Sequence, residues 1–130
     1  MSFYNETPVK AVRKARQCAG CRSMIEVGQP ALNCAGHQDD FWHATYHHEC
    51  RKAEIALNDL HDIRWADDWI NLGDDMEDDD WPWLLEEFPT VAERMNITAE
   101  RIEKKRQRDE EMRQRWLEQT SRQPKGSNHG

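Results

Sequence analysis

The sequence predicts a mostly helical protein with one small β-hairpin, organised as two modules. Two observations predict it: cysteine and histidine residues occur in close pairs in the first half, and apolar residues recur at helical spacing further on. At 130 residues the chain holds one domain or two very small ones. Its composition divides it into a basic N-terminal arm 1–15, a cysteine-rich module 16–62, an acidic linker 63–80, a helical module 81–119 and a tail 120–130.

The cysteine-rich module has the spacing of a metal site. Cys18 and Cys21 form a C-x2-C pair, and His47 and Cys50 form an H-x2-C pair. Zinc takes four such ligands in a tetrahedron, and a C-x2-C bend supplies two thiolates from one turn. His47 and Cys50 lie three residues apart, so they share one face of the first turn of a helix. We therefore predict one structural Zn2+ on these four residues, with Gly20 supplying a positive φ in the bend.

The sequence also allows a second set of zinc ligands, because residues 34–37 repeat the Cys-Ala-Gly pattern. Cys34 and His37 would then replace His47 and Cys50 as partners of the first cysteine pair. We favour His47 and Cys50 because an apolar stripe at helical spacing follows them. The stripe consists of Ala53, Ala56, Leu57 and Leu60. Its helix is expected to end near residues 61–62, after two or three short strands between 22 and 46, with 31–32 and 41–42 among them.

Residues 16–61 resemble a treble-clef zinc finger of the poly(ADP-ribose) polymerase type. The matching positions are Cys18 and Cys21, then Ile25 and Gly28, then Tyr46, His47 and Cys50. The resemblance implies the same four zinc ligands, on a thiol hairpin that faces the start of a helix. Fingers of that family recognise DNA breaks, and the same scaffold also serves as a structural clip.

The segment after the acidic linker carries start and stop signals for three helices. Pro82 and Pro89 each open a short helix, because proline is tolerated in a first turn. Asn96 is expected in a left-handed turn position, where asparagine is one of the few residues found. Thr98 is a good N-cap for the third helix.

Residues 80–108 resemble a helix-turn-helix of bacterial and phage regulators. Ala92 matches the small residue where the two helices touch, Asn96 replaces the usual glycine of the turn, and Ile102 matches the residue that packs back. The resemblance implies that the helix from Thr98 is a recognition helix.

In a recognition helix the first turns meet base edges and nearby basic side chains hold phosphates. Arg101 is the expected base contact, and the expected phosphate contacts are Lys104, Lys105 and Arg108. An ordinary surface helix is the alternative for this stretch, with ion pairs such as Glu100–Lys104.

The same helix is expected to continue well beyond Arg108. Thirteen of residues 100–118 are charged, and the apolar stripe of Ile102, Met112 and Trp116 is interrupted by Asp109. Such a helix buries little of itself, so we expect it to project and to pair with a partner or with a second copy in a homodimer. Residues 120–130 are expected to form a flexible tail.

The net charge of −7 is strongly segregated along the chain. It is +2 over residues 1–53, −12 over 54–97 and +3 over 98–130. The basic flanks favour a small zinc-binding, DNA-binding regulator of phage or bacterial origin. The acidic middle favours the alternative, a zinc-stabilised adaptor or inhibitor, or an acidic DNA mimic, that binds a host protein. Its expected contact residues are Trp81, Trp83, Asp78 and Asp79.

The sequence supports neither catalysis nor membrane insertion. A catalytic zinc keeps one position open beside three protein ligands, whereas four good ligands are present here. No apolar run approaches the roughly 18 residues that a membrane span requires. No signal peptide is evident, so we expect a reducing, cytoplasmic location.

Overall fold

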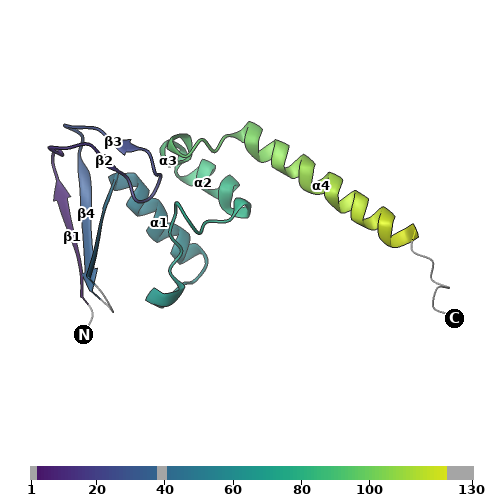
Figure 1. Ribbon diagram of the computed structural model, residues 1–130, viewed down its shortest axis with the longest axis horizontal. Coiled ribbons are helices and arrows are strands. Elements are labelled where there is room, and N and C mark those ends of the chain that lie inside the picture. Colours follow the sequence, from purple (N-terminus) through teal and green to yellow (C-terminus); the bar gives the residue numbers. More distant parts are fainter. Residues whose placement is uncertain (1–2, 38–40, 123–130) are drawn as a thin grey trace. The chain divides into compact units, whose positions relative to one another are not determined.

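The computed structural model describes residues 3–37 and 41–122 and forms two compact units (Figure 1). The first unit is Met1–Ile97 and the second is Thr98–Gly130. The boundary falls inside the segment 81–119, which the sequence predicts as one helical module. Within the described ranges, no helix is long and apolar enough to cross a bilayer.

The first unit contains two antiparallel sheets. The larger has the strand order β1-β4-β5, formed by β1 (Phe3–Val9), β4 (Ala31–His37) and β5 (Phe41–Tyr46). The smaller pairs β2 (Arg16–Gln17) with β3 (Met24–Ile25). Residues 31–32 and 41–42 begin β4 and β5 respectively, as predicted, but β4 continues to His37.

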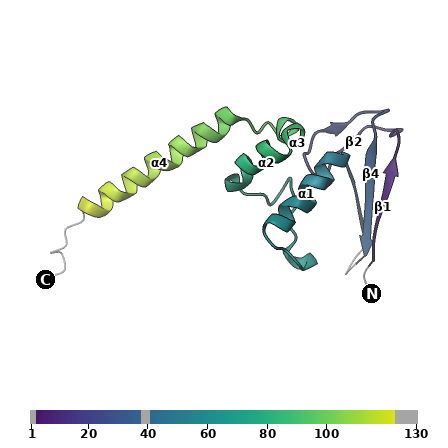
Figure 2. The ribbon, with the colours of Figure 1, turned by 180° about the vertical axis from the view of Figure 1, so that it is seen from behind.

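Helix α1 (His48–Leu60) lies between the larger sheet and helix α2 (Trp81–Glu87), in both views of the ribbon (Figures 1 and 2). Two short 3-10 helices come next, η1 (Ala66–Asp68) and η2 (Asp78–Asp80). Helices α2 and α3 (Pro89–Arg94) complete the unit. The core draws fully buried apolar side chains from almost every part of it: Ile25, Leu57, Leu72, Leu84 and Val91.

The prediction of a mostly helical protein with one small hairpin is wrong. About 48% of the described residues are helical and 20% are in strands, and the strands form two sheets. The strand that sequence reasoning missed is β1, inside the predicted basic arm 1–15. Pro8 lacks the N–H that an interior strand needs, so the segment does not look like a strand. Because β1 lies at the edge of its sheet, beside β4 alone, the proline is tolerated there.

The predicted acidic linker 63–80 is fastened to α1. The side chain of Asn58 donates to the carbonyl of Ile70 over 2.9 Å and accepts from its N–H over 2.8 Å. The N–H of Leu72 donates to the Glu54 carboxylate over 2.9 Å, and Leu72 is buried. The segment therefore contributes core and polar contacts to the first unit.

The second unit is built on one long helix, α4 (Ala99–Arg122). The predicted cap is confirmed, since the Thr98 hydroxyl accepts a hydrogen bond from the N–H of Arg101 over 3.1 Å. The left-handed turn at Asn96 is also confirmed, with φ of 58°. Residues 120–122 of the predicted tail are helical, and 123–130 lie outside the described residues.

Candidate metal centre

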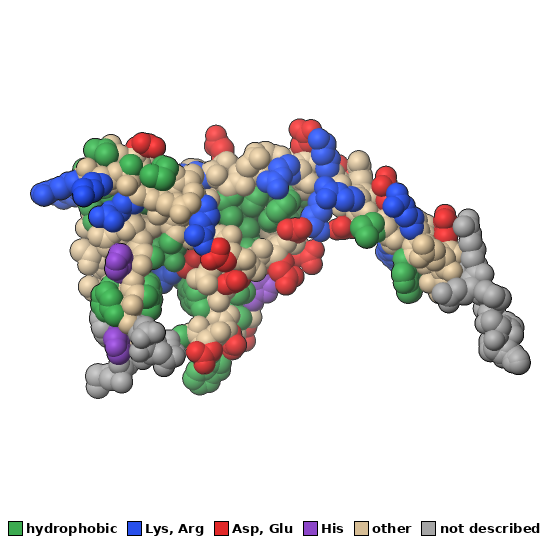
Figure 3. All heavy atoms as spheres, in the orientation of Figure 1, with side chains coloured by type: hydrophobic (Ala, Val, Ile, Leu, Met, Phe, Trp, Pro, Cys, Tyr) green, Lys and Arg blue, Asp and Glu red, His purple; other side chains and the backbone are tan. Residues whose placement is uncertain are grey.

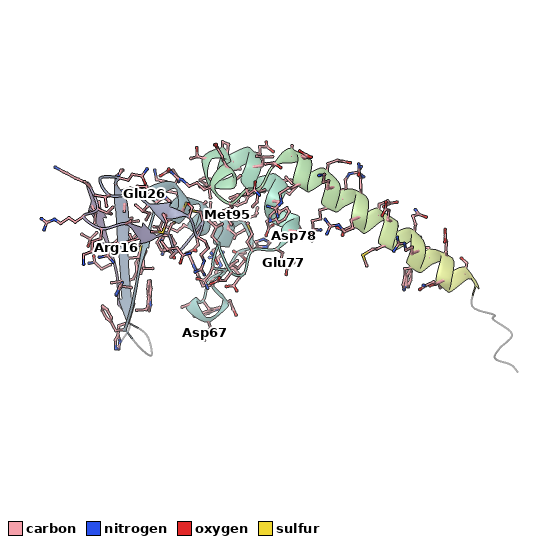
Figure 4. The ribbon with its side chains drawn as sticks, turned by 45° about the horizontal axis from the view of Figure 1, so that its top comes forward. Arg16, Glu26, Asp67, Glu77, Asp78 and Met95 are labelled. Atoms are coloured by element: carbon pink, nitrogen blue, oxygen red, sulfur yellow. The ribbon has the colours of Figure 1, made fainter. Side chains whose placement is uncertain are left out.

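Two tight turns position the four predicted ligands. Cys18 and Cys21 lie in the turn that joins β2 to β3; Figure 4 labels Arg16, the first residue of β2, and Glu26, which follows β3. In that turn the N–H of Cys18 donates to the Ser23 carbonyl, and its carbonyl accepts from the N–H of Arg22. His47 and Cys50 come from the other side, as the N-cap and first-turn residues of α1.

The ligand atoms lie together at zinc-site distances. All four lie within 4.8 Å of one another, and all four residues are buried. His47 Nδ1 is 3.4 Å from Cys21 Sγ and 3.7 Å from Cys50 Sγ. A tetrahedron with Zn–S of about 2.3 Å and Zn–N of about 2.0 Å has edges of roughly 3.5–3.8 Å. The group is therefore a buried site suited to one structural zinc ion, as predicted, with Nδ1 as the histidine ligand atom.

Gly20 is needed in the turn for a different reason from the one predicted. Its φ is not in the left-handed region, and the positive φ of the turn belongs to Arg22, at 70°. A Cβ on Gly20 would lie 2.9 Å from the Cβ of Cys50 and 3.3 Å from the Tyr46 ring. Glycine is therefore required because the two ligand-bearing turns approach each other closely.

Backbone N–H groups are aimed at the sulfur of Cys18. The amides of Gly20 and His47 each donate to Cys18 Sγ over 3.3 Å. Hydrogen bonds of this kind favour a charged sulfur, which is the form that binds zinc. Within the thiol cluster, hydrogen bonds with Cys18 and, to a smaller extent, with Cys50 lower the pKa of Cys21. Hydrogen bonds with Cys18 and, to a smaller extent, with Cys21 raise the pKa of Cys50. Metal binding must therefore displace protons from this cluster.

Arg94 links α3 to the metal ligands. Its Nη1 lies 3.7 Å from Cys50 Sγ and 2.9 Å from the Glu49 carboxylate, on the residue next to the ligand. Partial burial works against ionisation of Glu49, but its own backbone N–H and Arg94 outweigh that effect and lower its pKa. A positive group beside a zinc-bound thiolate offsets the negative charge of a site with three cysteines.

The rival ligands do not join the metal group. Cys34 is buried in β4, and burial raises the pKa of its thiol. His37 is exposed at the end of the same strand.

The remaining predicted contact residues also lie outside the metal group. Arg101, Lys104, Lys105 and Arg108 are on α4. Asp78 and Asp79 are exposed in η2, and Trp81 and Trp83 are half-buried in α2.

Sequence reasoning missed a buried ion pair next to the centre. Glu54 is fully buried in α1, and its Oε2 accepts from Arg51 Nη1 over 2.7 Å and from the Tyr46 hydroxyl over 2.9 Å. The Arg51 guanidinium lies 5.2 Å from the centres of the Tyr4 and Tyr46 rings and 5.3 Å from that of Trp69. The sequence spacing could have indicated this buried pair. Glu54 lies four residues after Cys50, so it shares the helix face that carries the buried metal ligand.

Comparison with protein families, with curated proteins and with solved structures finds no match for this chain.

Proposed function

We propose that this chain is a small zinc-stabilised, DNA-binding regulatory protein of phage or bacterial origin. The observation that carries the proposal is an exposed basic loop, defined as Lys10, Arg13 and Lys14 between β1 and β2 together with Arg16, the first residue of β2. The chain has no acidic residue between Glu6 and Glu26. Figure 3 shows Lys and Arg side chains gathered at this end of the sheet.

The four cations of the basic loop are available to phosphates. Among the described residues none of them forms an ion pair, so no internal carboxylate offsets their charge. The zinc turn begins two residues after Arg16 and fixes the end of the loop on the folded unit. Such a loop suits backbone contacts, which supply most of the sequence-independent affinity for DNA.

The expected recognition helix has a smaller part in this proposal than its sequence suggests. Lys104 pairs with Glu100 over 3.2 Å, and Lys105 pairs with Asp109 over 2.6 Å, so carboxylates of the same helix partly neutralise both charges. Arg101 keeps the role of base contact because it lies in the first turn after the Thr98 cap. Arg108 remains a phosphate contact.

The zinc has a structural role in this function, and we propose no catalytic activity. Four protein ligands fill the tetrahedron, which leaves no open position for a substrate or an activated water.

The test combines selection from random duplex DNA at near-physiological salt with affinity measurements across salt concentrations. Each phosphate contact adds about 0.9 to the slope of log affinity against log salt. Lys14→Ala and Arg16→Ala should each reduce the slope by about that amount and leave the selected sequence unchanged. Arg101→Ala should relax preference at one base pair, at a cost of about 1–3 kcal/mol.

Lys52→Ala is the matched control, since Lys52 is exposed on α1 outside the basic loop. An equal loss of slope in this control would mean that net charge alone attracts DNA. Selection without enrichment, together with affinity that does not depend on salt, would refute the proposal.

A protein partner is the second candidate, favoured by the charge of −12 over residues 54–97. The part of this segment that follows α1 is held against α1 at Ile70 and Leu72, so it presents its carboxylates on a fixed surface. A basic host protein would then contact Asp78 and Asp79 beside Trp81 and Trp83. Asp79→Asn should weaken that complex and leave DNA affinity no lower than that of the wild type.

A further inference from the structure

A groove opens in the first unit between the larger sheet and the segment after α1. Its volume is about 1010 Å3. Tyr4, Trp42 and Tyr46 line it from the sheet, and Asp67, Trp69 and Asp75 line it from the opposite segment. Figure 3 shows the hollow between the lower end of the sheet and the acidic segment, whose tip is labelled by Asp67 in Figure 4.

The ionic groups of the groove leave an excess of negative charge. Arg22 pairs with Asp74, and Arg51 pairs with Glu54 over 2.7 Å and with Glu6 over 3.3 Å.

Two further carboxylates of the lining, Asp67 and Asp75, have no cationic partner among the described residues. Within the part of the chain that the structure describes, Asp75 accepts hydrogen bonds only from the backbone and side-chain amides of Asn71, at 3.0 and 2.9 Å. A bound cation would therefore meet two carboxylates that no described arginine of the groove pairs with.

Aromatic rings form the other component of the lining. Tyr4 and Trp42 lie 6.0 Å apart between ring centres and are 47% and 41% exposed, so a ligand can reach their faces. Three aromatic rings of the lining already contact one guanidinium within the protein, since Arg51 lies over the rings of Tyr4, Tyr46 and Trp69. Ring faces attract cations through their quadrupole, and arginine is the most frequent partner.

We propose that the groove binds arginine or lysine side chains presented by a basic segment of a partner protein. The exposed carboxylates of the lining, Asp67 and Asp75, and the exposed aromatic faces are groups that together recognise a guanidinium or an ammonium group. Nucleic acid is disfavoured here because its phosphates would meet Asp67 and Asp75. The volume exceeds that of a single side chain, so a short peptide segment is the occupant. The groove is a contact of the protein-partner candidate in addition to Asp78, Asp79, Trp81 and Trp83, and it shares no residue with the basic loop.

The experiment uses the full zinc-loaded chain and two blocked peptides, tri-arginine and tri-citrulline, which differ in charge and are nearly equal in shape. Binding is followed by NMR through the indole N–H signals of Trp42 and Trp69. Tri-arginine should shift both signals in a saturable way, and tri-citrulline should shift neither. Asp67→Asn and Trp42→Leu should each weaken tri-arginine binding about threefold to fivefold, as exposed ion-pair and cation–π contacts do.

Two control variants separate the groove from general attraction to an acidic protein. Asp59→Asn removes one exposed carboxylate of α1 outside the groove, and Trp116→Leu removes one exposed tryptophan of α4. Both should bind tri-arginine like the wild type. Equal binding of the two peptides, or equal weakening by Asp67→Asn and Asp59→Asn, would overturn the proposal.

The salt dependence of DNA binding by Asp67→Asn distinguishes this inference from the DNA proposal. An unchanged slope, together with lost peptide affinity, supports the groove whether or not the basic loop binds DNA. Loss of DNA binding in Lys14→Ala with normal peptide affinity leaves the groove proposal intact.

Discussion

The two units of this chain are stabilised by opposite kinds of interaction. In the first unit, residues far apart in sequence meet in a buried polar interior: four metal ligands from two turns, and a carboxylate that joins α1 to β5 and to the segment after it. In the second unit, α4 carries ion pairs between residues three or four apart, and its apolar side chains Met112 and Trp116 are 62% exposed. The first unit therefore depends on a few sites, whereas α4 depends on many weak local contacts.

This difference predicts where a single change is damaging. Buried ligands and buried charges lose a partner that water cannot replace, so their removal costs several kcal/mol. Exposed pairs on a helix are solvated before and after the change, so each contributes only a few tenths of a kcal/mol. The changes below test this contrast from the largest expected effect to the smallest.

Loss of zinc should have the largest effect. Structural zinc contributes about 10–16 kcal/mol of apparent binding free energy in small fingers, which matches or exceeds the net stability of about 5–15 kcal/mol of a typical domain. Cys18→Ser should therefore release the metal and unfold residues 16–61, while the amides of α4 keep the hydrogen-exchange rates that they have in the wild type. Zinc content and exchange measured by mass spectrometry test both parts.

Cys34→Ser is the matched control for that experiment, because Cys34 is also a buried cysteine but lies outside the metal group. It should retain one zinc per chain. Zinc loss in this control, with retention in His47→Ala, would restore the rival ligand set.

Removal of the buried carboxylate should have the next largest effect. Glu54→Ala leaves Arg51, a residue that is only 8% exposed, without the closest anion of its guanidinium. Breaking one partner of a buried pair costs about 3–5 kcal/mol, measured here by urea unfolding of the zinc-loaded protein. Glu26→Ala, at an exposed position, should change stability by less than about 0.5 kcal/mol. Equal losses of stability in the two variants would show that the buried ion pair stabilises the first unit no more than an exposed residue does.

The metal centre could be predicted from the sequence because its information is local. Each ligand pair is three residues apart, and zinc chemistry restricts how two such pairs combine. The same holds for Asn96 and Thr98, where one residue type at one position decides the turn and the cap.

The remainder of the first unit could not be predicted because it depends on pairings between distant residues. Strand β1 forms because it pairs with β4 at the edge of the sheet. Pro8 makes the segment look unlike a strand in the sequence, although an edge strand tolerates proline. The acidic segment 63–80 has the composition of a solvated hinge, but Asn58 and Glu54 of α1 form hydrogen bonds with the backbone of Ile70 and Leu72. The groove follows from these two pairings and is therefore equally hidden.

Arg94 offers an intermediate effect, since it joins α3 to the metal ligands from a half-buried position. Arg94→Leu removes the donor to Cys50 and the partner of Glu49, and outer-shell contacts of this kind change metal affinity about tenfold or more. We expect about tenfold weaker zinc binding in competition with a chelator, with the fold of the loaded protein preserved. Arg64→Leu, at an exposed arginine away from the site, should bind zinc like the wild type. Unchanged zinc affinity in Arg94→Leu would show that Arg94 does not contribute to metal binding beyond the four ligands.

The smallest effect is expected on α4. Asp109→Asn removes the partner of Lys105, an ion pair at i,i+4 whose acidic side chain is 60% exposed. Pairs of this kind contribute about 0.2–0.5 kcal/mol to a helix, and salt screens them. Hydrogen exchange along α4 should therefore accelerate by about twofold or less at low salt and match the wild type near 1 M salt. Glu118→Gln is the control for a change of charge alone, because among the described residues Glu118 forms no ion pair. A loss of zinc or an altered urea midpoint of the first unit in Asp109→Asn would contradict the comparison, because it would show that a local pair on α4 supports the distant contacts of the other unit.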